Sequence, residues 1–348
     1  MRNFNKHGLL ICFAFIFSFP VFSQIQTRGD ILKQASRIQA QKEKITYDQI
    51  KILAQQKGWQ LVMKDKKGNI AILVDVDAFG LPIYTSTETN LLAANTIGTS
   101  SLWPGGSTGL NLSGSSNNVK NKLALWDGGK VRNTHQELTG RVVQRDASTT
   151  LEDHSTHVAG TLIASGIVPE AKGMSFGQQQ LVVYDFSNDA SEMMNEAPNL
   201  LVSNHSYSSI AGWRYNETQS RWEFWGQADA DEDYKFGYYS AQAQLWDSIA
   251  YNAPYYLIVK AAGNNRTENG PAVGSPYWRL DANGVMVNSG NRPAGISNND
   301  SYDIITTYGT SKNILTVGAV YPIAYGYKKP WDVIMSTFSS WDQQMTVV

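Results

Sequence analysis

From about residue 120 onward, apolar residues recur in short and nearly continuous runs. Such runs are typical of strands that are buried on both faces, as in a parallel sheet. Apolar residues at helical spacing separate some of the runs, first from Val158 to Ile163 and again from Ala241 to Ala250. Strands that alternate with helices predict a layered α/β fold with a mostly parallel, twisted sheet. The predicted strands are Leu123–Trp126, Leu181–Tyr184, Leu200–Val202, Tyr256–Ala262 and Ile314–Val320.

Residues 24–92 show another pattern, which predicts a separate small α+β unit. Thr46-Tyr47-Asp48-Gln49 resembles a capping box that opens a helix, and Ile50, Leu53 and Ala54 would form the buried stripe of this helix. Two strand-like runs follow at residues 61–63 and 70–74, with a plausible hairpin turn at residues 66–69. Residues 98–119 are rich in Gly, Ser, Thr and Asn, which is the composition of a loop.

The first residues of the chain predict a secretory signal peptide. Arg2 and Lys6 precede an apolar run from Leu9 to Phe19, and Val21-Phe22-Ser23 suits cleavage after Ser23. This run is too short for a stop-transfer helix, and no second run is long enough to span a membrane. We therefore expect a secreted or extracytoplasmic protein without a membrane span after signal removal.

The composition of the chain limits which binding partners and which covalent cross-links can be expected. The 348 residues include 42% hydrophobic and 17% charged residues, which favours a packed globular fold. The net charge of -1 gives no reason to expect binding to nucleic acid or to an anionic membrane surface. The only cysteine, Cys12, lies within the signal segment and is a poor fit to a lipid-attachment site, so the mature chain would contain no disulfide.

Polar residues directly after the predicted strands are the first candidates for a functional site. In open α/β sheets, ligands bind beyond the carboxyl ends of the strands. Asp127 follows the first strand, residues 203–206 follow the third, and Asn264 follows the fourth. A buried carboxylate such as that of Asp127 is costly unless it has a partner. His154 opens the apolar helix that comes next in the chain and could supply this partner.

Three segments resemble the signature segments of the subtilisin family of serine peptidases. They are Asp127-Gly128-Gly129, His154-Ser155-Thr156-His157-Val158-Ala159-Gly160-Thr161 and Ala261-Ala262-Gly263-Asn264, in the order of that family. Weaker similarities occur at Ile167–Lys172, Ile314–Val320 and Phe338-Ser339-Ser340, so the resemblance covers roughly residues 120–348. Gly128 and Ser155 depart from the residues usual in the family, and residues 265–312 carry an insertion of unknown role.

The resemblance implies a serine endopeptidase that acts on proteins or peptides. His154 would be the general base, Asp127 would orient its imidazole, and Asn264 would donate to the oxyanion. Ser206, Tyr207 and Ser208 resemble the segment that pairs with the substrate backbone. No cofactor is required, and calcium is possible without being indicated by the sequence. His135 and His205 receive no role and are expected to make ordinary surface or buried polar contacts.

The nucleophilic serine of the family is missing from this chain. Its Gly-Thr-Ser-Met-Ala motif would follow Phe338-Ser339-Ser340, but the sequence ends at Val348. Ser100 comes before Asp127, and Ser311 leads into a predicted strand rather than a helix, so neither fits. The chain as given is expected to be inactive. The alternatives are an inactive relic or peptide-binding module on the same fold, and a metallohydrolase built on His154 and His157.

The sequence therefore predicts three regions. Residues 1–23 form a signal peptide, residues 24–92 resemble a prosegment that is cut away between Asp77 and Asn95, and residues 93–348 form an incomplete subtilisin-like peptidase domain.

Overall fold

The computed structural model describes residues 27–64, 70–77, 80–87, 94–299, 303–321, 323 and 326–341. The predicted signal peptide and the predicted turn at residues 66–69 lie outside these described residues. Within the described part of the chain, no helix combines the length and the apolar character that crossing a bilayer requires.

A six-stranded parallel sheet forms the centre of the molecule, with the strand order β14-β11-β7-β4-β6-β5. The strands predicted from apolar runs are all present, which confirms the α/β fold. The third strand begins at Val202, two residues later than predicted. Leu200 is apolar because it is buried in the core ahead of the strand, and its apolar character led to the earlier predicted start. The strands are β4 (Leu123–Asp127), β5 (Val142–Gln144), β6 (Leu181–Asp185), β7 (Val202–His205), β11 (Leu257–Ala261) and β14 (Leu315–Val317).

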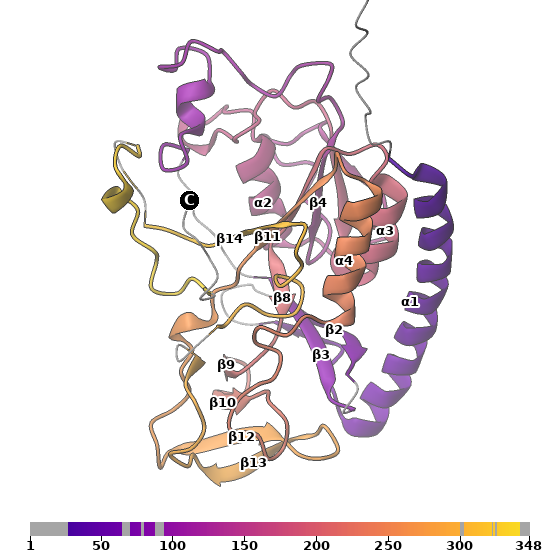
Figure 1. Ribbon diagram of the computed structural model, residues 1–348, viewed down its shortest axis with the longest axis vertical. Helices are drawn as coiled ribbons and strands as arrows, with labels where there is room; N and C mark the ends of the chain where they lie inside the picture. Colours follow the sequence, from indigo (N-terminus) through magenta and orange to yellow (C-terminus); the bar gives the residue numbers. More distant parts are fainter. Residues whose placement is uncertain are drawn as a thin grey trace, which may run out of the picture.

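Helices cover both faces of this sheet (Figure 1). Alternate side chains of a strand point to opposite faces. Accordingly, Leu125 and Val183 pack in one cluster with α2 (Asp153–Ile163), whereas Trp126 and Tyr184 pack in another with α3 (Asp189–Glu196) and α4 (Ala241–Asn252). Short 3-10 helices occur in the connections, at η1 (Thr99–Leu102), η2 (Pro169–Ala171), η3 (Phe186–Asn188), η4 (Asn265–Thr267) and η6 (Pro330–Asp332).

The N-terminal unit, residues 27–87, packs against the α3 and α4 side of the molecule. Its long helix α1 (Gly29–Lys57) contacts α3 and α4, and ends at Gly58 in a left-handed conformation. The capping box predicted at Thr46 is wrong, because α1 continues through this residue from Gly29. Three strands follow the helix: β1 (Val62–Lys64), β2 (Ile70–Val76) and β3 (Pro82–Thr87).

Strand β3 joins the N-terminal unit to the rest of the chain. It pairs antiparallel with β8 (Tyr207–Ser209), which gives a second sheet with the order β1-β2-β3-β8. The register places Thr85 opposite Ser209 and Thr87 opposite Tyr207.

A third sheet forms a separate lobe at the lower end of the molecule in Figure 1. We call it the four-stranded lobe; its order is β13-β12-β10-β9. Strands β12 (Pro276–Leu280) and β13 (Met286–Asn291) belong to the insertion seen in the sequence. They pair with β9 (Trp213–Asn216) and β10 (Arg221–Phe224), which the sequence analysis had not recognised as strands.

Candidate active site

Asp127 and His154 meet at the carboxyl end of the central sheet. Asp127 is the last residue of β4, and His154 lies in the first turn of α2. The Nδ1 atom of His154 lies 2.7 Å from Oδ1 of Asp127. Both residues are buried, with 0% of Asp127 and 4% of His154 exposed. A carboxylate in contact with Nδ1 fixes the tautomer and orientation of the imidazole.

Two further donors reach the same carboxylate oxygen. The backbone N–H of Gly128 donates to Oδ1 of Asp127 at 2.7 Å, and Oγ of Ser155 donates to it at 3.1 Å. Among the described residues, the buried Oδ2 atom has no hydrogen-bond partner. The sequence analysis noted Ser155 only as a departure from the family pattern. The signal of this contact in the sequence was a serine directly after His154, the histidine expected to contact the buried carboxylate of Asp127.

His157 lies on α2, three residues after His154. It lines a surface hollow of about 450 Å³ together with Arg132 and His135. Burial lowers the pKa of His157, and the neighbouring His154 lowers it further. Within the described part of the chain, no group of three or more His, Cys, Asp or Glu residues is arranged to hold a metal ion. The described residues therefore give no support to a metal site on His154 and His157.

Asn264 and Ser206 line one cavity of about 160 Å³. Asn264 precedes η4 and is half-buried. The walls of the cavity are largely apolar, and include Val158 and Leu162 of α2 as well as Val317 of β14. The cavity therefore lies on the α2 side of the sheet, the same side as the Asp127–His154 pair. An amide side chain at such a place can donate to a developing negative charge.

Tyr207 and Ser208 lie in β8, but their side chains do not face an open groove. Only 2% of Tyr207 and 6% of Ser208 is exposed. The backbone of β8 carries the pairing with β3. Any role of these residues in holding an extended chain would thus come from their main-chain groups.

The phenol of Tyr207 belongs to a buried polar network on the α3 and α4 side of the sheet. Its hydroxyl donates to Oδ2 of Asp189 at 2.8 Å and lies 2.8 Å from Nδ1 of His205. The other ring nitrogen of His205 lies 2.7 Å from Oγ of Ser203. Burial lowers the pKa of His205 well below its ordinary value, whereas burial raises the pKa of Asp189 to about 7. Sequence reasoning gave no role to this histidine.

The two other Gly-Thr-Ser serines lie apart from the pair. Oγ of Ser311 donates to the carbonyl oxygen of Ala243 in α4 at 3.1 Å, so Ser311 lies on the face opposite α2. Oγ of Ser100 donates to Oδ1 of Asn95 at 2.6 Å in the loop that carries η1.

The solved structures that match this chain have low sequence identity to it. The prenylagaramide maturation protease PagA is 14% identical with a TM-score of 0.36, and the match covers 65% of this chain and 60% of that chain. The serine protease of Aeromonas sobria is 17% identical with a TM-score of 0.35, over 63% of this chain and 34% of that chain. The epidermin leader peptide processing serine protease from Staphylococcus aureus is 14% identical with a TM-score of 0.29, over 52% and 47% of the two chains.

The present chain thus spans 60% of the length of the first of these proteases and about a third of the second. No curated protein matches the sequence. The identification rests instead on a family profile, because the subtilase family (Peptidase_S8) matches residues 94–342. The same residues contain the Asp127–His154 pair at the edge of a parallel sheet. The chain therefore belongs to the subtilase family.

Proposed function

We propose that this chain is part of a secreted serine endopeptidase that hydrolyses proteins or peptides. The observation that carries the proposal is the buried contact between Asp127 and Nδ1 of His154 at the carboxyl edge of the sheet. With Nδ1 held by the carboxylate, Nε2 is the nitrogen that takes the proton from a serine hydroxyl. The serine oxygen then attacks the peptide carbonyl, and the imidazolium returns the proton to the leaving amine.

Asn264 would stabilise the negative charge that develops on the carbonyl oxygen. Its position on the cavity beside α2 supports this role, because an amide donor acts best in a site shielded from water. No cofactor takes part in this chemistry, and calcium would have at most a structural role.

The nucleophile would be a serine on a segment that follows Val348. Ser311 is bonded to α4 on the other face of the sheet, which argues against it as the nucleophile. The apolar cavity between α2, β11 and β14 is where such a segment would pack beside His154. On this proposal, the chain as given has no serine-dependent turnover.

A fluorophosphonate probe tests this proposal, because it reacts only with an activated serine. We expect no labelling of residues 24–348 and labelling of a chain extended beyond Val348. Labelling of Ser311 in the shorter chain would contradict the assignment. An extended chain that folds but is not labelled would favour a noncatalytic peptide-binding module on the same fold.

Residues 24–92 would act as a prosegment that is cut from the peptidase between Asp77 and Asn95. The pairing of β3 with β8 supports this role, because it places an N-terminal strand along the segment expected to hold substrate. Export would leave Gln24 as the first residue, which N-terminal sequencing of secreted material tests. An active enzyme that keeps residues 24–92 covalently attached would contradict the prosegment role.

A further inference from the structure

Three contacts between the N-terminal unit and the rest of the chain differ in kind. One contact is the β3–β8 pairing described above. A second lies between α1 and α3, where Oγ of Ser36 donates to the carbonyl oxygen of Ser191 at 2.7 Å, and Ser191 bonds Glu43. The third joins the unit to the four-stranded lobe. The family resemblance gave no role to this lobe.

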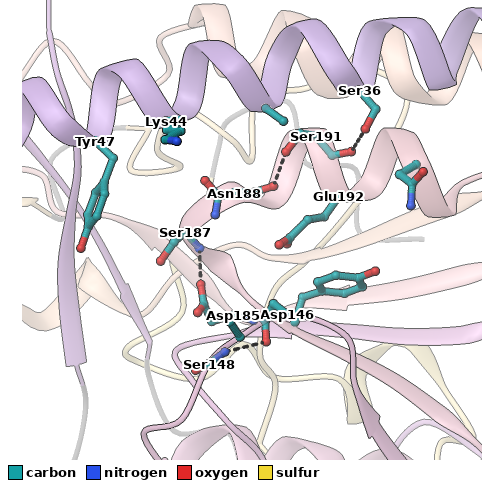
Figure 2. A pocket seen from close by; sticks show the side chains of 14 residues that line it. Ser36, Lys44, Tyr47, Asp146, Ser148, Asp185, Ser187, Asn188, Ser191 and Glu192 are labelled. Atoms are coloured by element: carbon teal, nitrogen blue, oxygen red, sulfur yellow. Dashed lines mark hydrogen bonds between the residues drawn. The ribbon is translucent and has the colours of Figure 1, made fainter.

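The contact between α1 and α3 is partly open. A hollow of about 700 Å³ separates α1 from the ends of β5 and β6 and from α3. Figure 2 shows Lys44 and Tyr47 of α1 on one side of this hollow, and Asp146, Asp185 and Glu192 on the other. Burial raises the pKa of Asp185 and Glu192, so these carboxyl groups are poorly solvated where they lie. This polar and hollow stretch lies beside an apolar one, in which Leu32 of α1 packs with Met193 and Met194 of α3 in the main core.

The contact with the lobe is a closed hydrophobic core. Ile50 and Ala54 of α1 and Leu73 of β2 pack in one buried cluster with Trp225 and Leu280 from the lobe side. The rings of Tyr84 and Trp225 meet edge to face, with their centroids 5.2 Å apart. Leu280 and Tyr277 lie on opposite faces of β12. Tyr277 packs in a separate buried cluster inside the lobe. Leu280 thus belongs to the core shared with the N-terminal unit, whereas Tyr277 belongs to the lobe.

Polar contacts border this shared core. Nε1 of Trp59 donates to the carbonyl oxygen of Gly284 at 2.6 Å, in the turn between β12 and β13. Lys57 donates to the carbonyl oxygen of Asn283 in the same turn. A Cβ atom on Gly284 would lie 2.8 Å from the carbonyl oxygen of Gly80 and 3.0 Å from the ring of Trp59. The turn is therefore fitted closely to the N-terminal unit.

From these contacts we propose that the four-stranded lobe, with the adjoining Trp225, is a dedicated docking surface for the N-terminal unit. It holds the unit independently of the β3–β8 pairing and retains it after the connection between residues 87 and 94 has been cut. This inference rests on the proposed function in one respect, namely that the unit is a prosegment. Removal of the prosegment then requires loss of the lobe contact as well as hydrolysis of the chain.

The test uses residues 24–348 with the recognition sequence of a site-specific endopeptidase in place of residues 88–93. After cleavage by the added endopeptidase, size-exclusion chromatography shows whether the N-terminal unit co-elutes with the remainder, and dilution gives its release rate. We expect co-elution from the unsubstituted chain. Release of the unit as soon as the chain is cut would overturn the proposal.

Gly284→Ala and Gly290→Ala form a matched pair for this measurement. Both glycines have positive φ angles, 74° and 75°, so alanine causes similar backbone strain at the two positions. A Cβ atom on Gly290 meets nothing within 4 Å, whereas one on Gly284 presses on Gly80. We expect G284A to release the unit roughly 10-fold or more faster, as for overpacking of a close contact, and G290A to behave as the unsubstituted chain. Equal release rates in the two variants would overturn the proposal.

Trp59→Phe gives a second readout if G284A does not fold. It removes the bond to Gly284 but keeps an aromatic ring, and the loss of one hydrogen bond predicts about 3- to 10-fold faster release. An unchanged rate would count against the proposal. Because an added endopeptidase makes the cut, these results do not depend on peptidase activity. Failure of the proposed function would instead appear as absence of fluorophosphonate labelling in the extended chain.

Discussion

Each face of the central sheet buries a histidine next to an oxygen-bearing partner, yet the surroundings of the two rings differ. His154 lies on the α2 face at the end of β4, where it contacts Asp127 at the edge of the sheet. His205 lies on the α3 and α4 face, between Ser203 and Tyr207, and 0% of it is exposed. Its ring is stacked on Trp126 and packed against Trp246.

The comparison shows that the proximity of Ser, His and Asp does not by itself make a catalytic site. A continuous series of hydrogen bonds links Ser203, His205, Tyr207 and Asp189. Aromatic rings enclose these residues, so no substrate can reach them. Burial strongly shifts the pKa values of Asp189, His205 and Tyr207 in this interior network. Shifted pKa values can mark structural networks as well as functional sites.

The strongest test of this difference is a matched pair of Asp→Asn substitutions, one on each face. In a chain extended through its serine, Asp127→Asn should lower kcat by about 10,000-fold, the size known for this change in other serine peptidases, because His154 loses its correct tautomer. Asp189→Asn should leave kcat unchanged. Turnover of a peptide substrate measures both. A similar loss of kcat in the two variants would show that the faces are not functionally distinct.

Removal of the interior imidazole should instead affect stability. His205→Ala leaves a cavity and removes one hydrogen-bond partner from each of two buried hydroxyl groups, so we expect the free energy of unfolding to fall by about 3 kcal/mol. His135→Ala, at an exposed position, should change it by less than about 0.5 kcal/mol. Urea unfolding measures both variants. Equal stability of the two would mean that the buried network contributes nothing.

Asn264→Ala examines the α2 face alone. In the extended chain, kcat should fall by about 100-fold, as in subtilisin when one oxyanion donor is lost, with little change in KM. The donor acts mainly on the transition state, so steady-state kinetics separates its role from simple substrate binding. A raised KM with unchanged kcat would place Asn264 in binding rather than in catalysis.

The last test concerns the pH dependence of stability. Asp189 has a raised pKa of about 7 in the folded protein against an ordinary value of 3.8, mainly because of burial and in spite of the hydrogen bond from Tyr207. As the pH rises from 3.8 to 7, the unfolded chain releases this proton first, so stability falls across this range. Asp189→Asn should remove this part of the dependence. The free energy of unfolding of both proteins, measured at pH 4 and at pH 7, provides the check. An equal change between the two pH values in both proteins would contradict the prediction.

The central sheet and the Asp127–His154 pair could be predicted because their signals are local. Leu123–Trp126 is buried on both faces, so its run of apolar residues indicated a strand directly. Asp127 and His154 stand in recognisable segments at the ends of elements. The start of α1 was missed because no residue of the helix between Leu32 and Ile50 is buried, so its first half shows no continuous apolar stripe.

The isoleucines of α1 explain this further. Ile31, Ile38, Ile45 and Ile52 recur every seven residues, but each is at least 50% exposed, so the visible repeat does not mark the core face. The four-stranded lobe was missed for another reason. Strand β10 pairs with β12, and α4 and β11 lie between them in the chain. No local pattern of hydrophobic residues reports a pairing across such a separation.

The stacking of Trp126 gives the α3 and α4 face an optical signature of its own. Its indole lies parallel to both Tyr184 and His205, with centroid separations of 5.0 Å and 5.3 Å. Aromatic rings fixed in an asymmetric interior give near-ultraviolet circular dichroism, which disappears when tertiary packing loosens although helices persist. Near-ultraviolet and far-ultraviolet spectra recorded together during unfolding would therefore show whether the aromatic packing of the protein loosens before the helices melt.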